Sequence, residues 1–395
     1  MIYLECIPKI FSFVPKTKDL TAYDRPNLDK IHNGTDVARQ SDYRVRCTPS
    51  RQNTMVKEML HGRDDVLWLN GDEPDVRNLF DGATSTLLKS IIGKQKISCN
   101  RRGTTHIRHR HIHQVDCRQH SRHSGHSHGS SSFDLSNKIN EPLTGRKFEY
   151  CMYPLSFAEM VANTGLIEEK RMLQQRLVYG YYPDVVCNAG DERAILSELS
   201  NSYLYKDILL LDKIKKSEKL IKLLQALAFQ VGSEVSFNEL SQICGLDPKT
   251  IDTYVSLLEQ SYIVFRLGSF SRNLRNELKF SRKIYFWDCG IRNAIISNYK
   301  SIDSRTDAGA LFENFVISER MKKIQYEKTY AKGYFWRTTA KSEIDYVEET
   351  DGKLSAFEFK WNPKRKASIP LTFSRAYPGT DFNAVTRDNC ESFLL

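Results

Sequence analysis

Short apolar runs alternate with stretches of helical character through the N-terminal half of the chain. Ser156, followed three residues later by Glu159, forms a capping box that predicts the start of a helix. The expected strands are 66–69 and 148–153, and the other expected helices are 79–92, 168–179 and 191–212. Together they predict an α/β domain with a parallel sheet over residues 1–212.

The middle of the chain has the pattern of a helix-turn-helix with a wing. An amphipathic helix is expected over 220–231, a second over 236–244 and a third after Asp247, and Gly245 makes the turn between the last two. A strand follows over 262–267. The predicted winged-helix module spans 213–272, and the exposed face of its third helix comprises Lys249, Thr250, Asp252, Thr253 and Ser256.

That exposed face offers little to a nucleic acid. It carries one lysine and one aspartate, which is poor for binding phosphates. A packing module between domains is therefore favoured over a DNA-reading module, although both remain open.

The last part of the chain, 273–395, predicts a third domain built around a hairpin. A strand is expected over 283–287 and a helix over 308–322. Two further strands, 343–347 and 354–361, flank an Asp-Gly pair that is typical of a hairpin turn.

Two carboxylates and a lysine fall on this hairpin. Side chains two apart share a face of a strand, so Glu358 and Lys360 point together, and the hairpin brings Asp345 beside them. Such a set can hold Mg²⁺ through Asp345 and Glu358, while Lys360 orients water near a phosphate. Glu313, on the preceding helix, is a fourth polar candidate. The alternative is a salt-bridge network on a solvated strand.

The spacing of these residues resembles the PD-(D/E)xK motif of restriction-endonuclease-like proteins. Asp345 is followed after 12 residues by Glu358, and then by Lys360. The proline that opens the motif is missing before Asp345. The resemblance implies a restriction-endonuclease-like α/β domain and a Mg²⁺-dependent nuclease.

Composition limits the class of protein. The 395 residues are 40% hydrophobic and 27% charged, as in globular proteins. No long apolar run predicts a membrane span, and residues 1–20 lack the features of a signal peptide. The 9 cysteines include no CxxC pair, which favours free thiols in a reducing compartment. We therefore expect a cytoplasmic protein that has no membrane partner.

The net charge of +10 comes mainly from two unusual segments, 39–51 and 97–128. The second contains eight of the ten histidines of the chain. It is either a histidine-rich metal-binding tract, a disordered loop or a stretch translated in the wrong frame. Permitted codons for 100–106, read one base later, spell Ile-Asp-Glu-Ala-Gln-Arg. Those for 46–54 spell Gly-Val-Arg-Gln-Val-Gly-Lys-Thr, which is a GxxxxGKT phosphate loop.

A frameshift at both segments would remove a nucleotide site. A phosphate loop needs glycines whose backbone N–H groups surround the phosphates, and a lysine. The written residues 49–53 contain no glycine, and Pro49 has no N–H to donate. Arg101 and Arg102 stand where a Mg²⁺-binding acid is expected. This translation therefore lacks both Walker motifs, and the DNA sequence of the coding region would decide the frame.

Several motifs outside these segments resemble one family. GSSSFDLS (129–136), LTGRKFEYCMYPLSFAEM (143–160), GYYPDVV (180–186) and YLYKDI (203–208) are similar to AAA-type ATPases of bacteria and archaea that carry a C-terminal nuclease-like domain. The resemblance implies ATP and Mg²⁺ as cofactors and a target that is DNA or another protein. It also makes Ser130 a sensor of the γ-phosphate and Arg146 a phosphate contact, against the simpler roles of a helix cap and a surface arginine.

Three functions follow from these patterns. The main interpretation is an ATPase homologue that is inactive towards ATP, with a degraded P-loop domain, a winged helix and a nuclease-like domain. The second is a metal-dependent nuclease that acts through Asp345, Glu358 and Lys360. The third is a non-catalytic DNA-binding regulator that uses the winged helix, in which Lys249 would contact DNA.

Overall fold

The computed structural model describes residues 42–47, 62, 64–70, 73–80, 84–93, 97–101, 124–129, 147–203, 217–271, 282–338 and 340–395. The chain forms two compact units, Met1–Tyr153 and Pro154–Leu395. The predicted division into three domains stays a prediction. Among the described helices, none combines the length and the apolar character that crossing a membrane requires.

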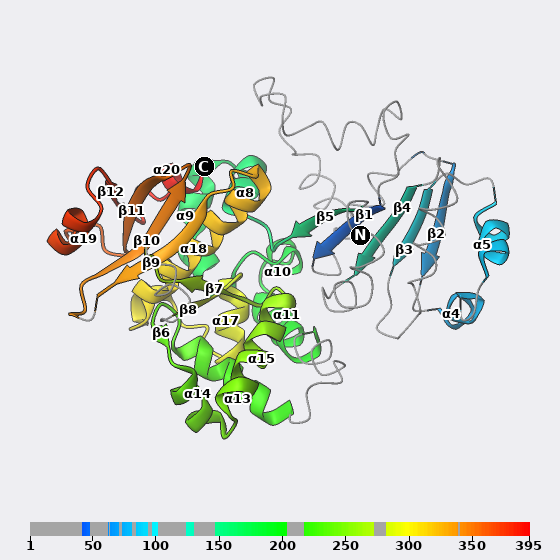
Figure 1. The fold of residues 1–395 in the computed structure, drawn as a ribbon, viewed down its shortest axis with the longest axis horizontal. Coiled ribbons are helices and arrows are strands. Elements are labelled where there is room, and N and C mark those ends of the chain that lie inside the picture. Colours follow the sequence, from blue (N-terminus) through cyan, green and yellow to red (C-terminus); the bar gives the residue numbers. More distant parts are fainter. Residues whose placement is uncertain are drawn as a thin grey trace. The chain divides into compact units, whose positions relative to one another are not determined.

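The first unit is built on a five-stranded parallel sheet (Figure 1). Its strand order is β2-β3-β4-β1-β5, so the carboxyl ends of β1 and β4 are neighbours. The strands are β1 (Asp42–Cys47), β2 (Val66–Asn70), β3 (Ile97–Arg101), β4 (Ser124–Gly129) and β5 (Lys147–Met152).

Sequence patterns predicted two of these strands, β2 and β5, and both are confirmed. The helix expected over 79–92 differs: the structure has two helices, α4 (Pro74–Phe80) and α5 (Ser85–Ile92). Strand β4 lies between two others, yet its sequence SGHSHG has no large apolar residue. Central strands of parallel sheets are normally rich in Val, Ile and Leu, and β4 lacks these residues.

The second unit begins with helices that follow the predicted signals. Ser156 and Glu159 form both hydrogen bonds of the capping box that opens α8. The helix predicted over 168–179 is confirmed as α9. Of the helix expected over 191–212, the structure describes α11 and a π-helical turn up to Tyr203, and residues 204–212 lie outside the described residues. The elements are α8 (Phe157–Thr164), α9 (Leu166–Tyr179), α10 (Pro183–Cys187), α11 (Glu192–Glu198) and η1 (Leu199–Tyr203).

Close packing joins α9 to α17 (Cys289–Ile295). Asp288 caps α17 by accepting hydrogen bonds from the backbone N–H of Ile291 and, from the α9 side, of Tyr181. A Cβ atom on Gly290 would lie 2.1 Å from the carbonyl oxygen of Tyr179. Only glycine therefore allows this approach of the two helices.

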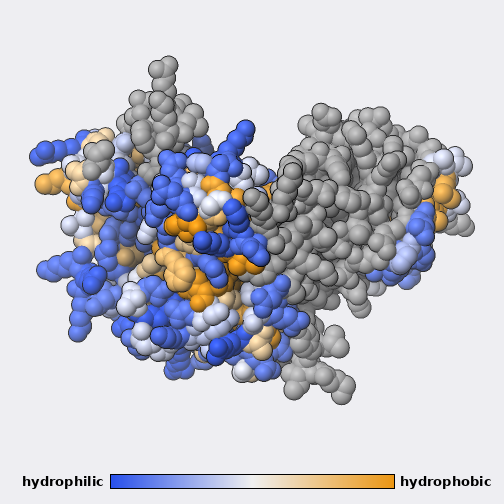
Figure 2. Space-filling model, turned by 90° about the horizontal axis from the view of Figure 1, so that it is seen from below, coloured by the Kyte–Doolittle hydropathy of each residue, from blue (hydrophilic) through white to orange (hydrophobic). Residues whose placement is uncertain are grey.

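Three helices and a three-stranded antiparallel sheet form the middle of the second unit. The left-handed backbone of Gly245 ends α14, and Asp247 caps α15 by accepting a hydrogen bond from the N–H of Thr250, as the sequence predicts. The sheet order is β6-β8-β7. The elements are α13 (Ser217–Phe229), β6 (Glu234–Val235), α14 (Phe237–Cys244), α15 (Pro248–Gln260), β7 (Val264–Gly268) and β8 (Arg282–Phe286). Figure 2 shows this side of the molecule, where apolar residues gather near the middle among hydrophilic ones.

A four-stranded sheet with the order β12-β11-β10-β9 forms the C-terminal part. The predicted Asp351-Gly352 turn has positive φ angles at both residues, 50° and 79°, and joins β10 to β11. The strands are β9 (Lys332–Arg337), β10 (Glu343–Thr350), β11 (Lys353–Lys360) and β12 (Asp381–Thr386). The helices are η2 (Ile302–Ser304), α18 (Ala308–Glu327), α19 (Leu371–Ala376) and α20 (Glu391–Leu394).

Apolar residues cover both faces of this sheet. Phe357 and Phe359 of β11 pack on Phe393 of α20, with ring centroids 4.5 and 5.7 Å away. Another core cluster joins the sheet to α19 through Trp336 and Phe373. The packing of Phe357 and Phe359 confirms that these aromatic side chains are covered. It therefore directs Glu358 and Lys360, which alternate with them along β11, to the opposite face of the strand.

Candidate functional site

Asp345, Glu358 and Lys360 come together at one end of the β10–β11 pair. The Nζ of Lys360 lies 2.5 Å from Oε1 of Glu358 and 4.0 Å from Oδ2 of Asp345. The same Oδ2 accepts a hydrogen bond of 2.8 Å from the backbone N–H of Phe359. The hairpin therefore joins the three residues as their spacing predicts.

Further charged groups surround this centre. Glu313 of α18 accepts hydrogen bonds from Lys283 (3.1 Å) and from the hydroxyl of Tyr285 (2.6 Å), both on β8. Lys283 also forms an ion pair of 2.6 Å with Glu343 of β10 and is only 1% exposed. The sequence pattern indicated Glu313 but not Lys283, Tyr285 or Glu343. The available signal was a lysine directly before the apolar run Ile284–Phe286 of β8.

The pKa of Asp345 is raised to about 7, chiefly because burial removes water from the carboxylate. The nearby charges of Glu313 and Glu358 add to this increase, while the N–H of Phe359 and the charge of Lys283 oppose it. For Lys283, burial alone would lower the pKa, but the charges of Glu313 and Glu343 outweigh it and raise the pKa. The raised pKa of Asp345 therefore reflects its burial first and the two neighbouring carboxylates second.

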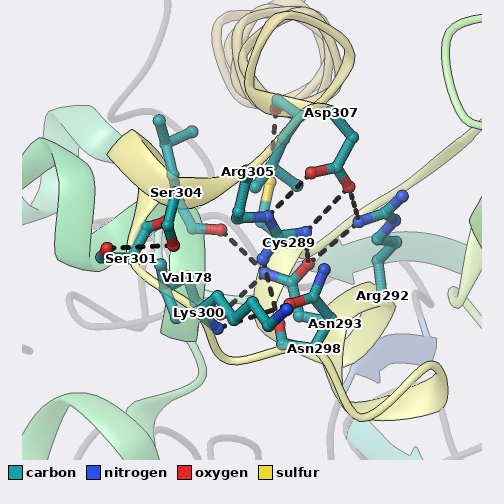
Figure 3. Close-up of polar contacts among 12 residues, drawn as sticks. Val178, Cys289, Arg292, Asn293, Asn298, Lys300, Ser301, Ser304, Arg305 and Asp307 are labelled. Carbon is teal, nitrogen blue, oxygen red and sulfur yellow. Dashed lines mark hydrogen bonds and ion pairs between the residues drawn. The ribbon is translucent and has the colours of Figure 1, made fainter.

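The helix that carries Glu313 is anchored at its start by a buried ionic network (Figure 3). Asp307 directly precedes α18 and accepts hydrogen bonds from Arg292 (2.6 Å) and Arg305 (2.8 Å). Both arginines also donate to Oδ1 of Asn293, whose side-chain amide donates to the carbonyl oxygens of Leu177 and Val178. The network therefore fixes α17, α18 and the end of α9 to one another.

Hydrogen bonds from Arg305 are the main cause of the lowered pKa of Asp307, and those from Arg292 add to it against the effect of burial. Asp307 thus remains ionised at any pH at which the protein would be handled.

The residues of the centre fit a magnesium ion. Mg²⁺ is usually bound by one or two carboxylates, with water and phosphate oxygens completing its shell. Asp345 and Glu358 supply two carboxylates, and a bound cation would offset the repulsion that Glu313 and Glu358 exert on the Asp345 carboxylate. Within the described ranges, no group of three or more His, Cys, Asp or Glu side chains has the arrangement of a metal centre. Ligands from solvent or substrate are therefore required.

Several sequence predictions lie outside the described residues. They are Ser130, Arg146, Arg102, the segment 48–54 and most of the histidine-rich tract. Their proposed contacts with a nucleotide stay predictions.

The face of α15 that could read DNA is partly engaged within the protein. Arg266 of β7 forms an ion pair of 2.9 Å with Asp252 and donates a hydrogen bond to the hydroxyl of Ser256. Arg282 lies 3.5 Å from the same carboxylate of Asp252. Lys249 and Thr253 remain exposed. This face therefore contributes to packing between α15 and the sheet.

The raised pKa of Asp345 has a consequence for stability. An unperturbed aspartate has a pKa of about 3.9. The pKa of Asp345 is higher in the folded protein than in the unfolded chain, so protonation of this carboxyl group stabilises the fold. This stabilisation is fully present below pH ~4 and is lost as the pH rises through about 7. Asp345→Asn has no charge to desolvate. Without metal, we expect it to melt several degrees above wild type at pH 8, and the gap to shrink at pH 5.

Calorimetry at the two pH values measures this difference. Asp381→Asn, at an exposed position on β12, is the matched control and should melt like wild type at both. A gap between Asp345→Asn and wild type that is the same at pH 5 and pH 8 would contradict the raised pKa.

Two family models match the second unit. A domain of unknown function (DUF8612) matches residues 170–301, and another domain of unknown function (DUF4143) matches residues 308–389. The second range contains Glu313, Asp345, Glu358 and Lys360. The candidate centre thus lies within the range that DUF4143 matches, apart from Lys283 and Tyr285, which belong to the first range.

Curated relatives are distant. An uncharacterized protein of Haemophilus influenzae is 28% identical over 180 residues, which are 42% of this chain and 44% of that protein. An uncharacterized protein of Mycobacterium tuberculosis is 23% identical over 268 residues, 64% of this chain and 57% of that protein. The chain spans about half the length of the curated relatives it matches.

Among solved structures, a Walker-type ATPase of Pyrococcus abyssi is similar at a TM-score of 0.45, with 11% sequence identity. The match covers 73% of this chain and 99% of that protein.

Proposed function

We propose that the second unit is a Mg²⁺-dependent phosphodiesterase of the restriction-endonuclease-like type. One observation carries the proposal: Asp345, Glu358 and Lys360 meet at one strand pair, where burial and neighbouring carboxylates raise the pKa of Asp345 to about 7. The order of elements α18, β9, β10, β11, α19 and β12 places both acids on the central hairpin. Cleavage of labelled DNA or RNA by wild type and by Asp345→Ala is the test.

The residues of the centre would have different roles in hydrolysis of a phosphodiester. In this reaction water adds to phosphorus, one P–O ester bond breaks and the leaving oxygen takes a proton. Asp345 and Glu358 would hold Mg²⁺, which supplies positive charge beside the phosphate and activates water. Lys360, in reach of both acids, would orient the phosphate or the attacking water through its ammonium group. Glu313 and Lys283 would keep the surroundings of Asp345 polar and ordered.

A second proposal concerns the first unit, which we infer to be a nucleotide-binding fold that has lost its ligand. In open parallel sheets, ligands bind beyond the carboxyl ends of strands where the connections diverge. Here the connection after β1 runs to β2, at one edge of the sheet, whereas the connection after β4 runs past β1 to β5, at the other edge. The two connections therefore diverge between the neighbouring strands β4 and β1. The segment after Cys47 and Ser130 after Gly129 follow those two strand ends. The observation supports the AAA-type resemblance.

The written segment 48–54 has the wrong chemistry for a phosphate, so we expect ATP with Mg²⁺ to give no thermal shift. The reasons are the absence of glycine from residues 48–54 and the missing N–H of Pro49. Thermal denaturation of the full chain with and without ATP and Mg²⁺ measures this, with Mg²⁺ alone as the control. A clear stabilisation that needs ATP would overturn the proposal.

The order helix, strand, helix, helix, strand, strand in 217–286 supports a winged-helix fold for the middle module. We propose that it packs between domains, because Arg266 and Arg282 already engage Asp252 on the third helix. A DNA-binding regulator remains the alternative, and unchanged DNA retention by Lys249→Ala would count against it.

A further inference from the structure

A cluster of basic side chains lies beside the Asp345 centre and takes no part in it. The loop 361–370 follows Lys360 directly and connects β11 to α19. It contains Lys364, Arg365 and Lys366, all exposed, and no aspartate or glutamate. Among the described residues, no carboxylate lies within ion-pair distance of these three side chains. Three adjacent cations are therefore presented to solvent next to the proposed site of cleavage.

The loop is tied to the fold at both ends, so the backbone that carries these cations is held in place. At its start, Trp361 packs on Phe312 of α18, with ring centroids 5.6 Å apart. Asn362 then holds a turn by accepting hydrogen bonds from the N–H groups of Lys364 and Arg365. At its end, Ile369 packs against the core cluster that contains Phe373.

Other basic residues lie at the same end of the sheet. Strands β11 and β12 are parallel, and Lys360 pairs with Thr386. The next residues along the two strands, Trp361 and Arg387, are therefore also neighbours, and the guanidinium of Arg387 lies 5.2 Å from the centre of the Trp361 ring. On the other side of the centre, exposed Lys341 lies in the turn between β9 and β10. One exposed acid, Asp388, lies 3.6 Å from Arg387 and offsets part of its charge.

The acidic centre is thus flanked by cations on both sides along the edge of the sheet. Four strands about 4.8 Å apart make this edge about 14 Å wide. A nucleic-acid strand advances about 3.4 Å per residue in a duplex, so the edge matches about four nucleotides. A small phosphodiester would need the central lysine alone, whereas cations on both sides suit successive phosphates of a polymer.

We propose that Lys341 and the loop residues Lys364, Arg365 and Lys366 form a track for the phosphate backbone of a polynucleotide that crosses the Asp345 centre. The inference rests on the proposed phosphodiesterase for the bond that is cut, but the track itself is a binding surface. It assigns to these four residues the phosphates on either side of the bond that is cut.

Binding without metal tests the track separately from cleavage. The full chain carrying Lys364→Gln, Arg365→Gln and Lys366→Gln is compared with wild type by fluorescence anisotropy of a labelled 20-nucleotide single strand in EDTA. We expect affinity to fall about tenfold or more. Since each lost phosphate contact lowers the slope of log affinity against log salt by about 0.7 for single strands, that slope should fall by about 2.

A matched control removes three cations elsewhere. Lys300→Gln, Lys332→Gln and Lys353→Gln are all exposed, and Lys332 and Lys353 lie at the opposite end of the sheet. This variant should bind like wild type. Equal losses in the two variants, no binding by wild type at low salt, or equally strong competition by poly(L-glutamate) would each overturn the track.

Hydrolysis of bis(p-nitrophenyl) phosphate with Mg²⁺ separates the two proposals. The loop variant should retain the wild-type rate on this small substrate, because Asp345, Glu358 and Lys360 are unchanged. In one outcome, neither wild type nor the loop variant hydrolyses any phosphodiester, while the loop variant still binds the oligonucleotide more weakly than wild type. That result would contradict the proposed phosphodiesterase and support the track.

Discussion

Asp345→Ala should abolish Mg²⁺-dependent cleavage of polynucleotides, with a loss of at least about 100-fold. The substitution removes one of the two carboxylates proposed to hold the cation, and even the loss of a supporting partner of a metal ligand typically costs 10–100-fold. It also removes the acceptor of the Phe359 N–H, which positions the end of β11. Gel analysis of end-labelled DNA and RNA at pH 8 measures the rate.

Two controls make this result specific. Asp381→Ala removes an exposed acid at the opposite end of the sheet and should cleave like wild type. Excess EDTA should stop the reaction in both. Equal product from wild type and Asp345→Ala would show that any cleavage comes from another site or from a contaminant, and the phosphodiesterase would be discarded.

Asp307→Ala should destabilise the second unit by about 3–5 kcal/mol, because it leaves two buried arginines without their shared carboxylate. Arg292 and Arg305 are 1% and 9% exposed, and both donate to Asp307 at 2.6–2.9 Å. Each can still reach Asn293, whose neutral oxygen cannot offset two charges. For a unit of this size the change corresponds to a melting temperature lower by about 10 °C.

Chemical denaturation followed by circular dichroism provides the measurement. Asp303→Ala, at an exposed position in η2, is the matched control and should change stability by less than about 0.5 kcal/mol. If Asp307→Ala lost no more than Asp303→Ala, the network of Figure 3 would not be what anchors the start of α18.

Local signals predicted the hairpin and its site. The Asp-Gly pair fixes the turn, and the period of two in a strand then places Glu358 beside Lys360. The partners on β8 are different, since Lys283 lies 60 residues before Glu343 in the sequence and only packing brings them to 2.6 Å. No local pattern carries that information.

The first unit shows the opposite situation. Its strands β2 and β5 have the apolar character that predicted them, whereas β1, β3 and β4 do not. Strand β4 lies between β3 and β1 in the sheet, yet it contains two histidines and two serines. The sheet order agrees with a nucleotide-binding fold, but the residues of β4 and those after β1 do not, as a shifted reading frame would predict.

Direct measurement of metal binding tests the central claim, that Asp345 and Glu358 form a divalent-cation site. Titration calorimetry of the full chain with Mn²⁺ at pH 8, in the absence of nucleotide, compares wild type with Asp345→Asn, and Asp381→Asn is the control. We expect one equivalent to bind to wild type and to the control, and that equivalent to be lost in Asp345→Asn. Equal binding by wild type and Asp345→Asn, or no binding by wild type, would contradict the account.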